Sequence, residues 1–92
     1  MSSRYVYTYF MTDDPAEIRQ VAPRHAQHWH GLKLRAYRGG PFADRSGGLI
    51  TFEVDDASQA NAAVAGDPFL RAGLVDHYWL KEWEPLSSRS SH

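Results

Sequence analysis

The spacing of apolar residues changes several times along the chain between the two-residue period of a strand and the 3.6-residue period of a helix. The patterns follow one another in the order strand, helix, strand, strand, helix, strand. The expected strands cover residues 5–11, 32–38, 48–54 and 74–84, and the expected helices cover residues 14–32 and 57–65. This order predicts a ferredoxin-like α+β sandwich (βαββαβ), in which both helices cover one face of a four-stranded antiparallel sheet.

The helices are predicted to begin and end at residues with clear local chemistry. Asp14 is a candidate N-cap, and Pro15 suits the first helical position. Gly31 is expected to end this helix in a left-handed conformation, where a side chain would be unfavourable. Asp67 and Pro68 repeat the pairing of a cap with a proline after the second helix, and they predict a short turn there.

Composition excludes several classes of protein. With 92 residues the chain is long enough for one domain, expected over residues 1–86, with a disordered tail at 87–92. The absence of cysteine excludes disulfides, thiolate zinc sites and a cysteine nucleophile. A net charge of −1, with basic and acidic residues mixed, predicts no nucleic-acid or anionic-membrane partner. Since there is no apolar run long enough for a membrane span or a signal peptide, a cytoplasmic location is expected.

The first strand alternates between two sets of side chains, Val6, Thr8 and Phe10 on one face and Tyr5, Tyr7 and Tyr9 on the other. We expect the helices to cover the first set. The tyrosines would then form a bare aromatic face, larger than a monomer usually exposes. This arrangement favours a homodimer that packs sheet against sheet, and the alternative is a stacking platform for a ligand.

One polar residue interrupts the apolar face of the first helix. His25 lies in a stripe formed by positions 18, 21, 22, 29 and 32, where a core residue is expected. A buried polar group without a hydrogen-bond partner costs roughly 1–3 kcal/mol, so the imidazole needs one, and Asp67 is a candidate. His25 is then either a satisfied core histidine or half of a His–Asp acid–base pair. Asp67 also suits an N-cap, and the two roles are compatible.

Several motifs in a fixed order resemble those of a known family. They are Arg24-His25, Gly40-Pro41-Phe42, Gly47-Gly48, Asp67-Pro68-Phe69 and Ala72-Gly73-Leu74. Over residues 5–84 the chain resembles the YciI-like (YCII-related) family of dimeric α/β-barrel proteins. The resemblance implies that His25 and Asp67 form a catalytic dyad. It also implies that the chain is related to a dehydrochlorinase that acts in the breakdown of chlorinated hydroxyquinones.

A His–Asp pair predicts acid–base chemistry at one ring nitrogen. The carboxylate would fix the tautomer of His25, leaving the other nitrogen to act as general base and acid in a pocket. This suits a lyase, an isomerase or a hydrolase acting on a small aromatic or quinone-like molecule. The candidate substrate-binding residues are Tyr7, Tyr9, Trp29 and Phe69 as walls, with Arg24 or Arg38 holding an anionic oxygen.

Two further hypotheses use the same residues without catalysis. The chain could be a ligand-binding or accessory dimeric module, or a structural dimer in which His25 is a core residue. The enzyme hypothesis requires His25 within about 3.2 Å of Asp67 and one ring nitrogen at a cavity.

Metal and cofactor sites are not expected. His25 and His28 lie one helical turn apart with His30 nearby, but the third ligand would have to be Asp67 or His77, and the spacing signals neither. No motif for haem, flavin or phosphate binding is present, and no serine lies in a nucleophile-elbow context.

Overall fold

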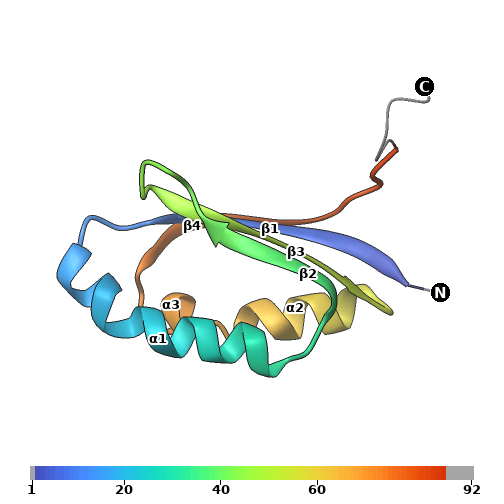
Figure 1. Cartoon of the computed structure of the whole chain (residues 1–92), viewed down its shortest axis with the longest axis horizontal. Helices are drawn as coiled ribbons and strands as arrows, with labels where there is room; N and C mark the ends of the chain where they lie inside the picture. The colour runs from blue at the N-terminus through green and yellow to red at the C-terminus, as the bar shows by residue number, and fades with distance from the viewer. Residues whose placement is uncertain (1, 87–92) are drawn as a thin grey trace.

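The computed structural model describes residues 2–86, which form a single antiparallel sheet with helices on one face (Figure 1). The elements are β1 (Ser3–Met11), α1 (Pro15–Gly31), β2 (Arg35–Pro41), β3 (Gly47–Val54), α2 (Ala57–Ala65), α3 (Pro68–Arg71) and β4 (Val75–Glu82). The four strands lie in the order β2-β3-β1-β4. The predicted ferredoxin-like architecture is therefore confirmed, whereas the predicted tail at residues 87–92 lies outside the described residues.

Helix α1 begins where its sequence predicts and ends differently. Asp14 is the N-cap, and its side chain accepts a hydrogen bond from the backbone N–H of Glu17 at 3.3 Å. Gly31 is not left-handed. The helical conformation continues into Leu32, so the left-handed residue is Lys33, with a φ of +52°. Strand β2 consequently begins at Arg35, later than expected.

Strand β2 runs through the Gly39-Gly40-Pro41 segment that we expected to break it. Proline cannot donate a hydrogen bond to a neighbouring strand, but β2 is an edge strand, so one side of its backbone needs no partner. The segment therefore pairs with β3, and Pro41 lies opposite Gly48.

Helices α2 and α3 follow their predicted caps. The side chain of Asp56 accepts the backbone N–H of Gln59 at 2.9 Å, and α2 ends before Gly66. Asp67 is the N-cap of α3, with Pro68 at its first position. None of the helices among residues 2–86 is long and apolar enough to cross a membrane.

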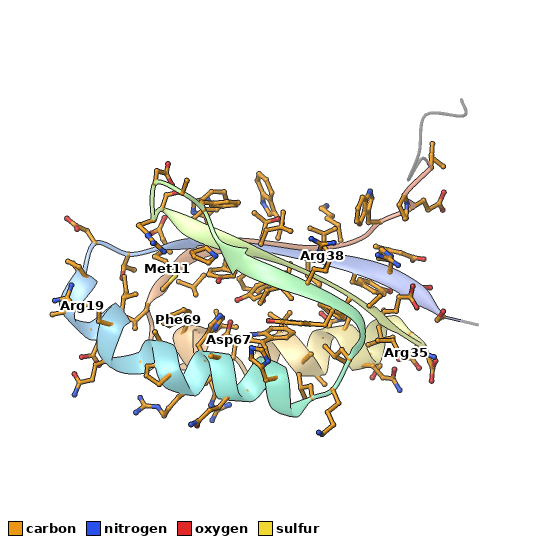
Figure 2. The ribbon with its side chains drawn as sticks, viewed as in Figure 1. Met11, Arg19, Arg35, Arg38, Asp67 and Phe69 are labelled. Atoms are coloured by element: carbon orange, nitrogen blue, oxygen red, sulfur yellow. The ribbon has the colours of Figure 1, made fainter. Side chains whose placement is uncertain are left out.

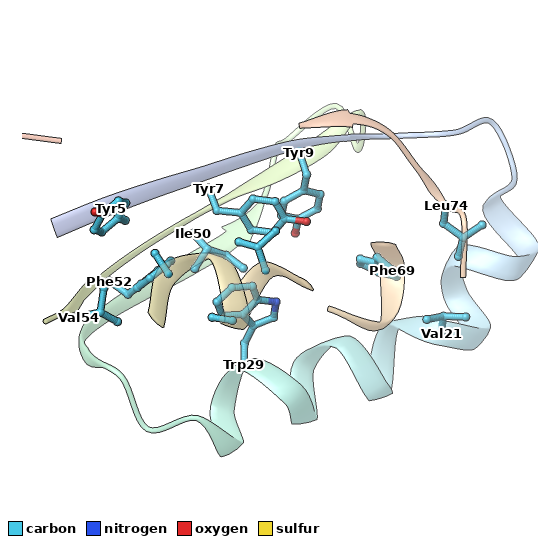
Figure 3. Close-up of a cluster of buried hydrophobic side chains, with 13 residues drawn as sticks. Tyr5, Tyr7, Tyr9, Val21, Trp29, Ile50, Phe52, Val54, Phe69 and Leu74 are labelled. Atoms are coloured by element: carbon cyan, nitrogen blue, oxygen red, sulfur yellow. The ribbon is translucent and has the colours of Figure 1, made fainter. Parts of the chain in front are cut away.

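The predicted orientation of β1 is wrong, because its tyrosines face the helices. Tyr5, Tyr7 and Tyr9 are 7%, 0% and 5% exposed. Figure 3 shows Tyr7 and Tyr9 extending from β1 toward the layer that holds Trp29 of α1 and Phe69 of α3. The Tyr7 and Trp29 rings stack with their centroids 5.6 Å apart. A tyrosine can be buried when its hydroxyl finds a partner, and that of Tyr7 does so within this layer.

The opposite face of the sheet, which we call the open face, carries the set of β1 residues expected to be buried. In register with Thr8 lie Leu49 of β3 and Trp79 of β4. Trp79 is 59% exposed, and the ring of Phe10 stacks on that of His77 at 4.6 Å. An uncovered face with aromatic residues is therefore present, but other residues form it.

Candidate active site

A histidine of α1 and an aspartate at the start of α3 meet between the helices and the sheet. His25 and Asp67 are 42 residues apart in sequence, and His25 Nδ1 lies 2.8 Å from Asp67 Oδ1. Because a carboxylate only accepts, Nδ1–H is the donor. The Asp67 side chain is fully buried, whereas that of His25 is 14% exposed. Figure 2 shows Asp67 and Phe69 in the layer between α1 and the sheet.

Asp67 accepts two further hydrogen bonds. The backbone N–H of Phe69 donates to Oδ1 at 2.9 Å, which caps α3, and the Tyr7 hydroxyl donates to Oδ2 at 3.1 Å. Burial by itself raises the pKa of Asp67. The hydrogen bond and charge of His25, together with the Phe69 and Tyr7 bonds, outweigh this and hold the pKa below its usual range. Asp67 is therefore an ionised, fully bonded carboxylate.

The His25 ring is held on both sides. It stacks on Phe69 with ring centroids 4.2 Å apart, and its Nε2 lies 3.4 Å from the Tyr9 hydroxyl. Burial, with a further contribution from the charge of Asp67, raises the pKa of Tyr9, so its hydroxyl stays protonated. Tyr9 has room there because residue 48 is glycine. A Cβ atom at Gly48 would overlap the Tyr9 hydroxyl.

His25 forms part of the wall of a cavity of about 640 Å³ between α1, the β2–β3 side of the sheet and α3. This volume is within the usual range for small-molecule sites. Much of the wall is apolar, with Met11, Ile18, Ile50 and Phe69 among its residues. The remaining wall includes side chains that can hydrogen-bond or carry charge, namely Tyr9, Tyr37, His30, Arg19 and Arg45.

Only some of the predicted substrate-binding residues line this cavity. Tyr9 and Phe69 do, whereas Tyr7 and Trp29 are buried in the core behind it. Arg24 is exposed outside the cavity, because adjacent helical residues point about 100° apart.

Arg38, the other arginine proposed for an anionic oxygen, also lies outside the cavity. It is opposite Thr51, which in turn is opposite Val6, and this places Arg38 on the open face.

Sequence reasoning missed Arg19, His30, Tyr37 and Arg45 as wall residues. The two on α1 carry a helical signal, because positions 15, 18, 19, 22, 26 and 30 share a side of the helix with His25. Tyr37 and Arg45 carry no such signal. Their place at the cavity depends on the pairing of β3 with β1, two strands that are distant in sequence.

The histidines do not gather around a common point. His28 Nε2–H donates to the backbone oxygen of Ala63 at 2.7 Å and so links α1 to α2. His77 lies on the open face, 3.0 Å from Asp76. Within residues 2–86 no three His, Cys, Asp or Glu side chains form a group that could hold a metal ion.

The sequence matches one family model over most of its length. Residues 5–84 match the model of the YCII-related domain. The chain belongs to the YCII-related family. No curated protein gives a significant match to it.

Solved structures with the same fold include proteins that act on small molecules. One is 5-chloro-2-hydroxyhydroquinone dehydrochlorinase from Burkholderia phenoliruptrix AC1100, in complex with 2,5-dihydroxybenzoquinone. It is 20% identical with a TM-score of 0.76, and the match covers 88% of this chain and 93% of that one. SnoaB, a cofactor-independent oxygenase from Streptomyces nogalater, is 14% identical with a TM-score of 0.56 and coverage of 98% and 96%.

A dimeric ferredoxin-like protein from Thermobifida fusca YX is also similar. It is 14% identical with a TM-score of 0.57, and 90% of each chain is covered. At these identities the likeness shows the fold, which agrees with the strand order described above.

Proposed function

We propose that this YCII-related protein is an acid–base enzyme acting on a small aromatic or quinone-like molecule. His25 is the general base and acid, and Asp67 positions it. The observation that carries this proposal is the 2.8 Å contact between His25 Nδ1 and Asp67 Oδ1, in a pair whose imidazole is part of a cavity wall. Among acid–base reactions we favour elimination of a proton and a leaving group (HX) from the substrate ring. Isomerisation and hydrolysis would use the same His25–Asp67 pair.

The geometry gives each group one task. Asp67 holds the proton of His25 on Nδ1 and stabilises the imidazolium that forms, so Nε2 presents a lone pair on the side of Tyr9. Nε2 takes a proton from the substrate, the electron pair of the broken bond to hydrogen forms a new double bond, and the leaving group departs as an anion with its own electron pair. The imidazolium then releases the proton to solvent, so HX is lost and no oxidant is consumed. A positioned acid–base group of this kind contributes typically about 10²–10⁴-fold in rate.

The protonated hydroxyl of Tyr9 supplies a second function. It lies beside Nε2 and lines the same cavity, so it can donate a hydrogen bond to an oxygen that gains negative charge during proton removal. Phe69 lines the cavity and stacks on His25, and it provides an apolar surface for a flat ring.

The fold neighbours support this class of substrate. The dehydrochlorinase of Burkholderia phenoliruptrix AC1100 is named for removal of hydrogen chloride from a chlorinated hydroxyhydroquinone, and its complex contains 2,5-dihydroxybenzoquinone. A His–Asp pair beside a cavity is suited to the same kind of elimination.

The test is release of chloride from 5-chloro-2-hydroxyhydroquinone by the wild type, His25→Asn and Asp67→Asn. We expect both variants to lose about 10²-fold or more in rate. Asp76→Asn is a matched control, because Asp76 pairs with His77 at 3.0 Å but both side chains are more than half exposed and neither lines the cavity. It should keep the wild-type rate.

The alternative is a non-catalytic module that binds a small ligand, which the largely apolar cavity wall also favours. Under that alternative the wild type binds 2,5-dihydroxybenzoquinone but releases no chloride. Turnover that survives His25→Asn would equally contradict the enzyme proposal.

We further propose that the protein is a homodimer in which a second copy packs on the open face. Support comes from the exposed side chains of Trp79 and Leu49 on that face and from the dimeric neighbour of Thermobifida fusca. The interface predicted from the tyrosines of β1 is thereby replaced by one formed on the other side of the same sheet. A cytoplasmic location stays a prediction.

A further inference from the structure

We propose that the cavity selects ligands whose ring carries an anionic oxygen group, and that Arg45 and Arg19 bind this group. This inference rests on the proposed function, because it assigns the charge of the substrate at the same site. The two arginines come from different elements, Arg19 from α1 and Arg45 from the β2–β3 hairpin, and both line the cavity.

The cavity wall contains basic side chains and no acidic ones. Its ionisable nitrogen-containing side chains are those of Arg19, Arg45, His25 and His30, and no aspartate or glutamate is part of the wall. The nearby Asp67 carboxylate is fully buried behind His25 and takes its hydrogen bonds from protein groups. A ligand therefore meets cationic groups and a hydroxyl-bearing apolar surface, without a competing carboxylate.

The cavity arginines also keep their hydrogen-bond donors available. Elsewhere in the sheet Arg4 pairs with Glu53 at 2.7 Å and Arg35 pairs with Asp55 at 3.0 Å. Over residues 2–86, neither Arg19 nor Arg45 has a carboxylate within 4.0 Å. A guanidinium with free donors binds a carboxylate or a similar oxyanion through two parallel hydrogen bonds.

The backbone at Arg45 supports a role for its side chain. Its φ is +65°, in the left-handed region that glycine adopts without strain. The turn is maintained by a hydrogen bond from the Arg45 N–H to Phe42 O at 2.9 Å. Glycine would adopt this turn without strain, whereas arginine adds a guanidinium to the cavity wall; Lys33 and Ala36, which also have positive φ, do not line the cavity.

The spacing along α1 separates the two functions. Arg19 and His25 are six positions apart, which corresponds to roughly 9 Å along a helix. Ala22 lines the wall in this interval, Ile18 lines it next to Arg19, and Ile50 lines it from β3. A substituted six-membered ring fits this apolar interval with its anionic group toward Arg19 and its reactive carbon toward His25.

The experiment measures binding without turnover, by NMR titration of the full chain. The probes are 2,5-dihydroxybenzoate, its neutral amide 2,5-dihydroxybenzamide, and 2,5-dihydroxybenzoquinone, whose acidic ring hydroxyls supply the anion without a carboxylate. We expect both anions to bind at least about tenfold more tightly than the amide. The tighter of the two anions identifies whether the site prefers a carboxylate or a ring oxyanion.

Substitution of the cavity arginines then tests where the anionic group of the ligand binds. Arg45→Gln and Arg19→Gln should each weaken binding of the anions about tenfold, equivalent to about 1.4 kcal/mol, and leave the amide unchanged. Arg24→Gln is the matched control, since Arg24 is an exposed arginine of the same helix outside the cavity. Because all three arginines are exposed, the variants should fold, and their unfolding temperatures check this.

Two results would overturn the inference: equal affinity of the wild type for anions and amide, or anion affinity unchanged in both cavity-arginine variants. Neither depends on His25. If His25→Asn retains turnover while Arg45→Gln loses anion binding, the acid–base proposal fails and the anion site stands. If His25→Asn loses turnover while both Arg45→Gln and Arg19→Gln bind the anions normally, only the anion site fails.

Discussion

At the scale of single residues, Asp67 combines a structural and a chemical role. One carboxylate oxygen both caps α3 through the Phe69 N–H and accepts the proton-bearing nitrogen of His25, while the other accepts the Tyr7 hydroxyl. His25 therefore has a hydrogen-bond partner for Nδ1 within the apolar stripe of α1, and Nε2 has the longer 3.4 Å contact with the Tyr9 hydroxyl. The cap and the pair, which the sequence left as compatible alternatives, coexist in the same side chain.

The depressed pKa of Asp67 makes stability depend on pH. Its folded-state pKa lies below the unfolded value of about 3.9, so the unfolded chain binds more protons in acid. The contribution is present in full above that value and is lost as pH falls through the folded pKa. Asp67→Asn should therefore unfold more easily at pH 7, by about 1.5–3 kcal/mol, and show a shallower decline in acid. Urea unfolding at a series of pH values measures both effects.

Asp76→Asn controls for general loss of an acid, because Asp76 is exposed and bonds only to exposed His77. Its acid decline should follow that of the wild type. An Asp67→Asn protein that declines in acid as steeply as the wild type would show that this carboxylate is not held in its charged form by folding.

At the scale of elements, features that depend on neighbours in sequence could be predicted better than features that depend on contacts distant in sequence. Asp14 and Asp67 cap their helices because capping depends on neighbours in sequence. The residues of β1 alone do not decide which face is buried, since Val6 and Phe10 in one set and the tyrosines in the other are all suited to burial. The partner that favours burial of Tyr7 is 60 residues away, so only the folded chain shows it.

The pairing of β1 with β3, in which Gly48 lies opposite Tyr9, provides a test of how Tyr9 is positioned. Because a Cβ at residue 48 would overlap the Tyr9 hydroxyl, Gly48→Ala should displace that hydroxyl from His25. We expect slower turnover, and a loss of about 1–3 kcal/mol in unfolding free energy from overpacking. Chloride release and urea unfolding measure the two.

Gly31→Ala is the matched control, because a Cβ at Gly31 meets nothing within 4 Å and its φ is not positive. It should keep the wild-type rate with stability unchanged or slightly higher. Wild-type turnover in Gly48→Ala would argue against a role for the position of the Tyr9 hydroxyl.

At the scale of the whole molecule, the two faces of the sheet serve different purposes. The face with the tyrosines of β1 forms the core and the cavity, and the open face is where we propose that a second copy binds. The presence of an uncovered aromatic face could be predicted from composition and strand period. The contribution of Arg45 to the cavity could not, because it depends on where the folded chain places the turn between β2 and β3 relative to α1.

The proposed dimer predicts that a charge on the open face separates the subunits. Trp79→Glu should sediment as a monomer where the wild type sediments as a dimer, since burying an unpaired carboxylate at an apolar interface is costly. Leu32→Glu is the control, because Leu32 is also exposed, at 40%, but follows α1 and lies outside the sheet. A dimeric Trp79→Glu protein would refute this interface.

In the proposed mechanism His25 presents an unprotonated nitrogen beside Tyr9 at the cavity, while its other nitrogen is bonded to Asp67. Long-range ¹H–¹⁵N correlation of the neutral imidazole reports this directly, because it distinguishes the two tautomers. We expect the proton to reside on Nδ1 of His25 in the wild type, and we expect Asp67→Asn to weaken this preference. A proton found on Nε2 in the wild type would contradict it, since no basic nitrogen would then face a substrate.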